Sequence, residues 1–248
     1  TVYILRYVNS DDQVSLDNID MRYTTILYTE ETDPETGDYV ELQRLQTIEN
    51  LIWVDYDQIP RHMIDAAVAI EDKRFWEHNG VDWKRTFGAF VNMFIPIYPT
   101  QAGGSTITQQ LIKNITDDDA VNVQRKVREI FRALNLSKRY SREQILEAYL
   151  NTIYFNNGCY GVQAAANVYF GKDVSELSVA ESASIIGITN APGAYNPFTN
   201  PENNKKRQED ILYAMFEQGY LTQQEYDDAV AEELVFTPQA AIDRVNPV

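Results

Sequence analysis

The stretch that decides how this chain folds reads Gly103-Gly104-Ser105-Thr106-Ile107-Thr108-Gln109-Gln110-Leu111-Ile112-Lys113-Asn114. Its two glycines give a loop that can pass close to a ligand, because no Cβ stands in the way. From Thr108 onward apolar residues recur at helical spacing, which predicts a helix. A glycine loop that leads into a helix N-terminus points backbone N–H groups at an anion, and Lys113 adds a positive charge. A capped helix after a surface loop is the alternative explanation of the same residues.

Length and charge set the limits for the rest of the chain. Its 248 residues suffice for one large domain or for a domain with a smaller lobe. The net charge is −16, yet it is uneven: residues 1–60 and 208–233 are acidic, whereas residues 121–142 carry seven cations and one acid. One basic stretch in an acidic protein suggests a local anionic ligand and argues against general nucleic-acid binding. The single cysteine, Cys159, excludes an internal disulfide and a multi-cysteine metal site.

Neither a membrane span nor a signal peptide is visible, since no stretch approaches the required apolar length. The chain begins abruptly at Thr1 and ends abruptly at Val248, so we expect it to be a piece of a longer protein.

The N-terminal part reads as strands and the remainder as helices. Residues 23–30 are rich in Thr, Tyr, Ile and Leu, residues 33–38 form a turn cluster, and residues 39–42 resume a strand pattern, so a β-hairpin is predicted. We expect an N-terminal segment at 1–55, a helical domain at 56–235 and a C-terminal linker at 236–248.

A helix is predicted to start at Pro60 and to end at His78-Asn79-Gly80. Its apolar face, which contains Ile64 and Val68, also contains Glu71. A carboxylate is costly to bury there unless it is paired or protonated, and general acid–base catalysis uses carboxyl groups in such surroundings. The alternative is an acid at the helix end that reaches solvent.

Two further stretches stand out. Residues 83–99 are apolar and are broken by Pro96 and Pro99, so they form either core or a mobile flap that dips into a membrane surface. Residues 124–140 form a strongly amphipathic helix, with Glu129 as the single acid among its cations. A solvated charged face is the usual explanation of such a pattern.

Five blocks of sequence, in order, closely resemble the peptidoglycan glycosyltransferase domain of class A penicillin-binding proteins and monofunctional transglycosylases. The blocks are Glu71-Asp72-Lys73-Arg74-Phe75-Trp76-Glu77-His78-Asn79-Gly80, Gly104-Ser105-Thr106-Ile107-Thr108-Gln109-Gln110 with Lys113-Asn114, Arg125-Lys126-Val127-Arg128-Glu129, Ile145-Leu146-Glu147-Ala148-Tyr149-Leu150-Asn151, and Arg207 with Ile211-Leu212 and Met215. The resemblance covers roughly residues 50–230. Asn156 replaces the glycine that the family usually has after Tyr154-Phe155.

The resemblance implies a mostly α-helical fold, with a lysozyme-like lobe, a smaller membrane-facing lobe and, in this chain, the N-terminal β-hairpin. It implies polymerisation of lipid II into glycan strands at the extracytoplasmic face of the bacterial cell membrane, on its outer leaflet. The growing glycan strand is the second substrate and undecaprenyl pyrophosphate leaves in one inverting displacement. A transpeptidase domain that follows in the parent chain and a transmembrane anchor outside this chain are further expectations.

The motif match assigns the roles of individual residues. Glu71 is expected to be the general base, and Glu129 the second carboxylate, which assists departure of the leaving group directly or through a divalent cation, Mg²⁺ or Mn²⁺. No organic cofactor is expected. Residues expected to bind substrate are Asp72, Phe75, His78, Ser105, Thr106, Gln109, Gln110, Lys113, Asn114, Arg125, Lys126, Glu147, Asn151 and Arg207.

Two other functions fit parts of this pattern. A lysozyme-like hydrolase or lytic transglycosylase would share the helical fold, but a glycan-cleaving enzyme does not need the cationic pyrophosphate site that Lys113, Arg125 and Lys126 suggest. A non-enzymatic scaffold or membrane-binding module gives no reason for Glu71 and Glu129 to stand in matching blocks.

Overall fold

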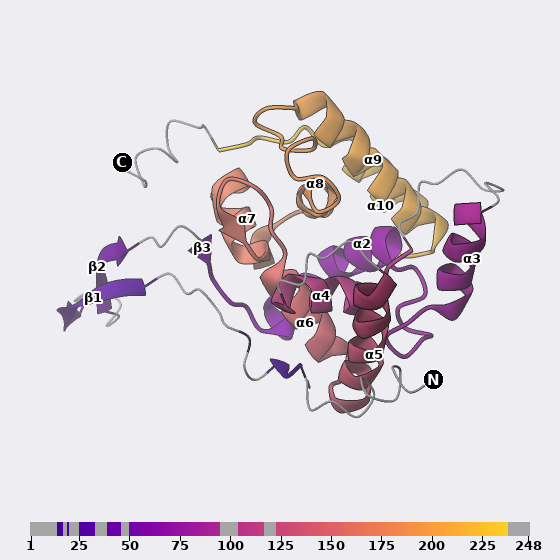
Figure 1. Ribbon diagram of the computed structural model, residues 1–248. Helices are drawn as coiled ribbons and strands as arrows, with labels where there is room; N and C mark the ends of the chain where they lie inside the picture. Colours follow the sequence, from indigo (N-terminus) through magenta and orange to yellow (C-terminus); the bar gives the residue numbers. More distant parts are fainter. Residues whose placement is uncertain are drawn as a thin grey trace.

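The structure is a computed structural model that describes residues 14–16, 19, 25–32, 39–45, 50–94, 104–116 and 123–237. Helices dominate it, which confirms the mostly α-helical class (Figure 1). The elements in chain order are β1 (Thr25–Thr32), β2 (Tyr39–Leu45), β3 (Asn50–Leu51), η2 (Tyr56–Gln58), α2 (Arg61–Glu71), α3 (Trp83–Phe94), α4 (Ile107–Thr116), α5 (Val123–Arg139), α6 (Arg142–Thr152), β4 (Cys159–Tyr160), α7 (Val162–Phe170), η3 (Val174–Glu176), α8 (Val179–Ile188), α9 (Pro201–Glu217) and α10 (Gln223–Ala231).

The helices form one body around α2 and α8. Every residue of α8 from Ala180 to Ile188 is buried, including the polar residues Glu181, Ser182 and Ser184. Helix α8 packs on α2 and α9, and α4 packs on α5 and α6. Small residues on α8 allow this close approach, since Gly187 lies directly against the side chain of Arg207 on α9.

Local sequence signals fix most of the helix ends. Capping boxes begin α6 at Ser141, α8 at Ser178 and α10 at Thr222, each with a glutamine or glutamate three residues later. Gly171 ends α7 in the left-handed conformation, with φ of 65°. Asn156 also has a positive φ, 70°, which asparagine tolerates better than most residues and which accounts for its replacing a glycine.

The first long helix is shorter than predicted. Helix α2 ends at Glu71 instead of continuing to residues 78–80, because Asp72 leaves the helix with φ of −155°. Its carboxylate turns away to accept a hydrogen bond from the backbone N–H of Ile107, at the start of α4. This departure makes Glu71 the last residue of the helix, with its side chain only partly buried.

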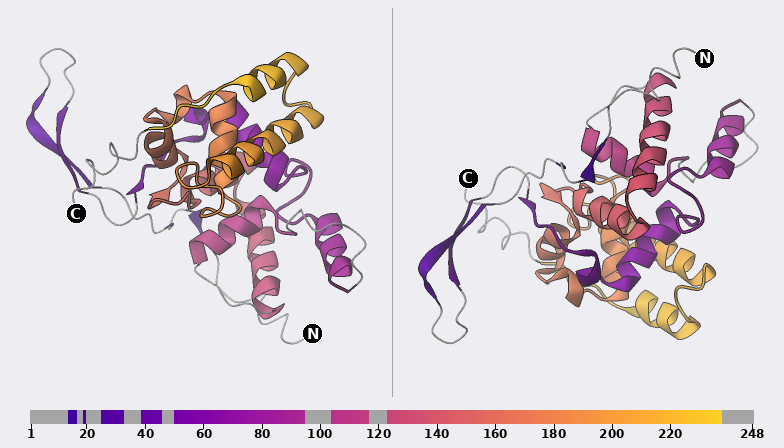
Figure 2. Two further views of the ribbon diagram at one scale, coloured as in Figure 1. Left: turned by 90° about the horizontal axis from the view of Figure 1, so that it is seen from above. Right: turned by 90° about the horizontal axis from the view of Figure 1, so that it is seen from below.

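The strands lie at one side of the helical body. Strands β1 and β2 pair antiparallel, with Thr25 opposite Leu45, and they project away from the helices (Figures 1 and 2). The turn predicted between them, at 33–38, lies outside the described residues. Strand β3 pairs with β4 in parallel, which ties residues 50–51 to the helical body.

The chain remains packed beyond the predicted end of the helical domain at residue 235. Phe236 packs on Phe170 of α7 at 5.0 Å between ring centroids, and the N–H of Thr237 donates to the carbonyl of Tyr169. Residues 236 and 237 therefore belong to the body, and the remainder of the predicted linker lies outside the described residues.

Helix α3 carries large apolar side chains that the body does not cover. Trp83 is 59% exposed and Phe87 is 69% exposed. Figure 2 shows α3 standing apart from the other helices in both views. The described part of the apolar stretch 83–99 is therefore a surface helix, and its end, with Pro96 and Pro99, lies outside the described residues.

Gly80 fixes the contact between the loop after α2 and helix α5. Its φ is 82°, and a Cβ at this position would lie 2.5 Å from the carbonyl oxygen of Ala133 and 2.4 Å from Oγ of Ser137. The carbonyl of Gly80 also accepts a hydrogen bond from Oγ1 of Thr106 at 2.6 Å. Only glycine satisfies both the conformation and the space.

We therefore expect Gly80→Ala to lower the free energy of unfolding by about 2 kcal/mol or more, through backbone strain and overpacking together. Gly219 is a matched control, because it has φ of 77° but nothing within 4 Å of the position that a Cβ would take. Gly219→Ala should show the strain alone, about 1 kcal/mol. Urea unfolding measures both, and an equal loss in the two variants would contradict the packing role of Gly80.

Candidate active site

Donors from two helices hold the carboxylate of Glu71, which ends a third helix, α2. Nε2 of Gln110, on α4, donates to Oε2 at 2.9 Å. Oγ1 of Thr189, which caps α8, lies 3.1 Å from Oε1 and shares its one proton between that oxygen and the carbonyl of Ile186, at 2.9 Å. The side chain is only partly buried. Each carboxylate oxygen can accept more than one hydrogen bond, so both donors leave Glu71 able to accept a proton. The structure thus pairs this carboxylate with neutral donors, one of the ways in which a carboxylate on an apolar face is stabilised.

A buried tyrosine sets the orientation of Gln110. The hydroxyl of Tyr149, on α6, donates to Oε1 of Gln110 at 3.1 Å. Burial raises the pKa of Tyr149 well above its usual value, and the nearby carboxylates of Glu71 and Asp72 raise it further. The hydroxyl is therefore a permanent donor, and the Gln110 amide must turn its NH₂ group toward Glu71.

Asp72 joins the end of α2 to the start of α4. It is 1% exposed, accepts from the N–H of Ile107 at 3.1 Å, and receives a hydrogen bond from Nε2 of His78 at 3.0 Å. The prediction that the glycine loop presents the α4 N-terminus to an external anion is wrong, because the anion at that terminus is the chain's own carboxylate.

The loop before α4 is held by its own side chains. Thr106 and Gln109 are fully buried, and each side chain accepts a hydrogen bond from the backbone N–H of the other residue. The alternative of a capped helix is therefore correct, and both residues lie inside the protein instead of on a binding surface. Gly103 lies outside the described residues.

Glu129 is buried in a cluster of cations. It is 5% exposed, and Nη1 of Arg125 donates to Oε2 at 2.9 Å while Nζ of Lys126 donates to Oε1. Lys126 also donates to Oγ of Ser105 at 2.8 Å, which links α5 to the loop before α4. The solvated face expected for this helix is wrong for these residues, since the acid and its two partners turn toward α4.

Helix α4 contacts the surroundings of both carboxylates. Gln110 meets Glu71, and one turn later Lys113 lines a small hollow together with Arg125, Glu129 and Arg132. Lys113 is exposed and has no hydrogen-bond or ion-pair partner among the described residues. An ammonium group without a partner in the described part of the chain, beside a buried ion-pair cluster, is a positive charge available to an anion. Asn114 is also exposed on this helix.

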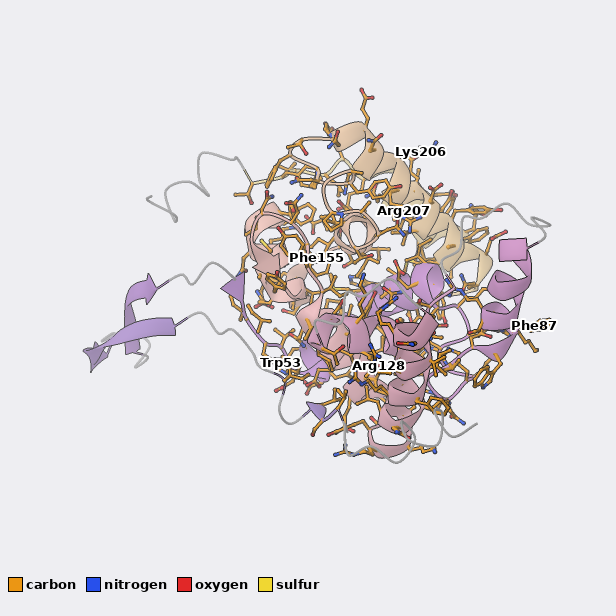
Figure 3. All side chains as sticks on the ribbon, in the orientation of Figure 1. Trp53, Phe87, Arg128, Phe155, Lys206 and Arg207 are labelled. Atoms are coloured by element: carbon orange, nitrogen blue, oxygen red, sulfur yellow. The ribbon has the colours of Figure 1, made fainter. Side chains whose placement is uncertain are left out.

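The remaining predicted site residues lie elsewhere in the structure. Phe75 is 2% exposed and packs edge-on against Trp76. Glu147 accepts from Trp53, and Asn151 donates to the carbonyl of Val54, so both hold the segment before α2 against α6. Arg207 lies on α9 over the ring of Tyr195, above Arg128 of α5 in the view of Figure 3. Substrate binding by these residues stays a prediction.

Two residues of the site were missed in the sequence. Tyr149 lies within a matching block, but its 3.6-residue spacing indicated only a core position. Thr189 follows the apolar run of α8, and no local signal marks it.

The donor set around Glu129 does not fit a divalent cation. Both carboxylate oxygens accept from cationic groups, and the described residues contain no group of three or more His, Cys, Asp and Glu side chains that could hold a metal ion. No step of the reaction is therefore assigned to a metal.

A helical fold with one carboxylate held by neutral donors and another among cations fits an enzyme of group transfer. A family model described as Transglycosylase matches residues 38–216. The chain belongs to the transglycosylase family, which confirms the class of enzyme that the sequence motifs predicted.

Similar proteins carry names from the penicillin-binding proteins. Penicillin-binding protein 1A of Aquifex aeolicus is 42% identical over 75% of this chain and 26% of its own length, and penicillin-binding protein 1F of Bacillus subtilis is 43% identical over 77% and 26%. Penicillin-binding protein 1A of Clostridium perfringens is 35% identical over 99% of this chain and 37% of its own length. The chain thus spans between a quarter and about two fifths of these relatives. Within its described residues, no helix has the length and apolarity of a membrane span.

We expect Asp72→Ala to lower the free energy of unfolding by about 2–3 kcal/mol, because it leaves a buried N–H and a histidine without their acceptor. Asp173 provides the control, since it is an exposed cap of η3 whose loss should cost about 1 kcal/mol or less. Chemical denaturation of the two variants gives the comparison. Equal losses would show that Asp72 does no more than an ordinary surface cap.

Proposed function

We propose that this chain polymerises lipid II into glycan strands, with Glu71 as the general base and undecaprenyl pyrophosphate as the leaving group. The observation that carries the proposal is the position of Glu71 at the C-terminal end of α2, linked through α4 and the loop before it to the ion-pair cluster of Arg125, Lys126 and Glu129. The names of the relatives support a role in a penicillin-binding protein.

In the proposed reaction Glu71 takes the proton of the acceptor's 4-hydroxyl group. The hydroxyl oxygen attacks the anomeric carbon of the donor on the face opposite to the pyrophosphate, so the configuration at that carbon inverts. The hydrogen bonds from Gln110 and Thr189 hold the carboxylate in one orientation and leave lone pairs for the incoming proton.

Negative charge develops on the leaving pyrophosphate, and the cations of α4 and α5 are placed to receive it. Lys113 has no competing partner among the described residues, whereas Arg125 and Lys126 are preorganised by Glu129. Interactions that strengthen as charge builds favour the transition state over the bound substrate. Glu129 in this arrangement orients the cations, which is how it assists departure.

The setting of the reaction follows from the same proposal. The exposed face of α3 would meet the outer leaflet of the cytoplasmic membrane, where lipid II is held. A transmembrane anchor and a C-terminal transpeptidase domain would lie in the parent chain. The alternative, a lysozyme-like glycan-cleaving enzyme, would release fragments from finished peptidoglycan, whereas the proposed enzyme would not.

Glu71→Gln should reduce polymerisation of lipid II in detergent by about 10²–10⁴-fold, because the amide keeps the shape and removes the base. The fold should remain, as judged by circular dichroism. Glu217→Gln, which changes an exposed glutamate of α9 in the same way, is the control and should retain full activity. Polymer yield from Glu71→Gln equal to that of the control would refute the assignment.

Arg125→Ala and Lys113→Ala should each lower the rate at saturating lipid II by about tenfold or more, since they remove charge-assisted contacts to the leaving group. A phosphoglycolipid inhibitor that mimics the donor should also lose affinity. Lys138→Ala is the control. It removes one positive charge at the exposed end of α5, at a distance from the cluster. Unchanged kinetics and inhibitor binding in Arg125→Ala and Lys113→Ala would show that these cations have only a structural role.

A further inference from the structure

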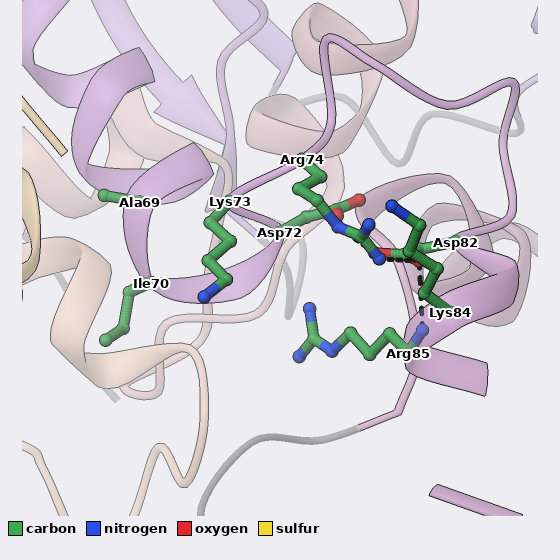
Figure 4. Close-up of a pocket in the computed structure, with 8 residues that line it drawn as sticks. All are labelled: Ala69, Ile70, Asp72, Lys73, Arg74, Asp82, Lys84 and Arg85. Carbon is green, nitrogen blue, oxygen red and sulfur yellow. Dashed lines mark hydrogen bonds and ion pairs between the residues drawn. The ribbon is translucent and has the colours of Figure 1, made fainter. Parts of the chain in front are cut away.

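A second cationic site lies between the end of α2 and the start of α3. A cavity of about 610 Å³ opens there, and half of the eight residues that line it are cations (Figure 4). The cations are Lys73, Arg74, Lys84 and Arg85. The cavity is distinct from the site around Glu71, because that side chain points to Gln110 and Thr189 and does not line it.

The positive charge of this cavity is not balanced by its acids. Asp82 is paired with Arg74, with 3.0 Å between Nε and Oδ2, and Asp72 is occupied by His78 and the start of α4. Among the described residues, the side chains of Lys73, Lys84 and Arg85 have no carboxylate partner, although the backbone N–H of Arg85 donates to Oδ1 of Asp82. Three such cations around one cavity, in a protein of net charge −16, indicate a site for an anion with more than one charge.

Two of the cations point into the same space. In Figure 4 the side chain of Lys73 extends from the end of α2 and that of Arg85 extends toward it from α3. Nη1 of Arg85 donates to the backbone carbonyl of Glu71, and its Nε is buried without a hydrogen-bond partner. A guanidinium with free N–H groups opposite an ammonium group matches the oxygens of a phosphate.

The surroundings of the cavity indicate where the phosphate comes from. Trp83 and Phe87 are one turn apart on the helix that carries Lys84 and Arg85, and both are exposed. Exposed aromatic side chains next to cations without carboxylate partners are typical of a surface that lies at the boundary between water and lipid. A soluble phosphate would need the cations but not the aromatic face.

We propose that this cavity binds the phosphate group of an anionic membrane phospholipid, with Lys73 and Arg85 on the phosphate and Trp83 and Phe87 toward the acyl chains. The proposal rests on the membrane-facing position of α3 in the proposed function. Because Arg85 also holds the carbonyl of Glu71, a phosphate bound there also fixes the helix end that carries the base.

Binding to vesicles tests this site without any measurement of activity. Vesicles of phosphatidylcholine are compared with an equimolar mixture of phosphatidylcholine and phosphatidylglycerol, by flotation at physiological salt. The net charge of −16 predicts repulsion from the mixed vesicles, so a preference for them requires a local cationic site. We expect the unmodified chain to prefer the mixed vesicles, and Lys73→Gln/Arg85→Gln to bind them about tenfold more weakly.

The control removes two cations elsewhere. Lys138→Gln/Lys206→Gln changes the net charge equally, at exposed positions on α5 and α9, and should keep the preference. The single variant Lys73→Gln should lose part of the preference for mixed vesicles. It carries no risk to folding, because Lys73 is exposed and has no carboxylate partner among the described residues.

Each other outcome overturns the proposal. Equal losses in both double variants would show general electrostatic attraction. Binding of inorganic pyrophosphate that the Lys73→Gln/Arg85→Gln variant abolishes, with no effect on vesicles, would show a soluble ligand. Equal binding to both vesicle types would contradict the phosphate site alone. Binding to neither vesicle type would contradict the membrane-facing position of α3.

Discussion

The hydrogen bond between the carboxylate of Asp72 and the backbone N–H of Ile107 holds the end of α2, which carries Glu71, against the start of α4, which carries Gln110. A negative charge at a helix N-terminus is favourable, and here burial protects the interaction from solvent. The bond ends α2 at Glu71 and begins α4 in the same place. The carboxylate of Glu71, its orienting amide on α4 and the loop that meets Lys126 all take their positions from it.

The two carboxylates of the site differ in what surrounds them, although both belong to matching sequence blocks. Glu71 meets an amide and a hydroxyl, neither of which carries charge. Glu129 is buried between two cations, an arrangement that would be costly if either were removed, because it would leave a buried charge poorly compensated. Neutral partners suit a group that gains a proton, whereas cationic partners suit a group that keeps its charge and orients its neighbours.

Local signals in the sequence predicted local structure well. The capping boxes at Ser141, Ser178 and Thr222, each readable in the sequence, begin helices, because those signals act within one turn. The end of α2 was not predictable in this way, since the hydrogen bond that ends it reaches a residue 35 positions later. The motifs named Glu71, Gln110 and Glu129, but the donors Tyr149 and Thr189 became visible only when distant helices were placed together.

The donors to Glu71 lie far along the chain, 39 residues away at Gln110 and 118 residues away at Thr189. Contacts of such separation form late in folding, because closing long loops costs entropy before the contacts compensate for it. Glu71 therefore receives its full set of partners only after α2, α4 and α8 have docked. A nascent or partly unfolded chain would carry the glutamate without the hydrogen bonds that orient it, so transfer activity would report completed folding.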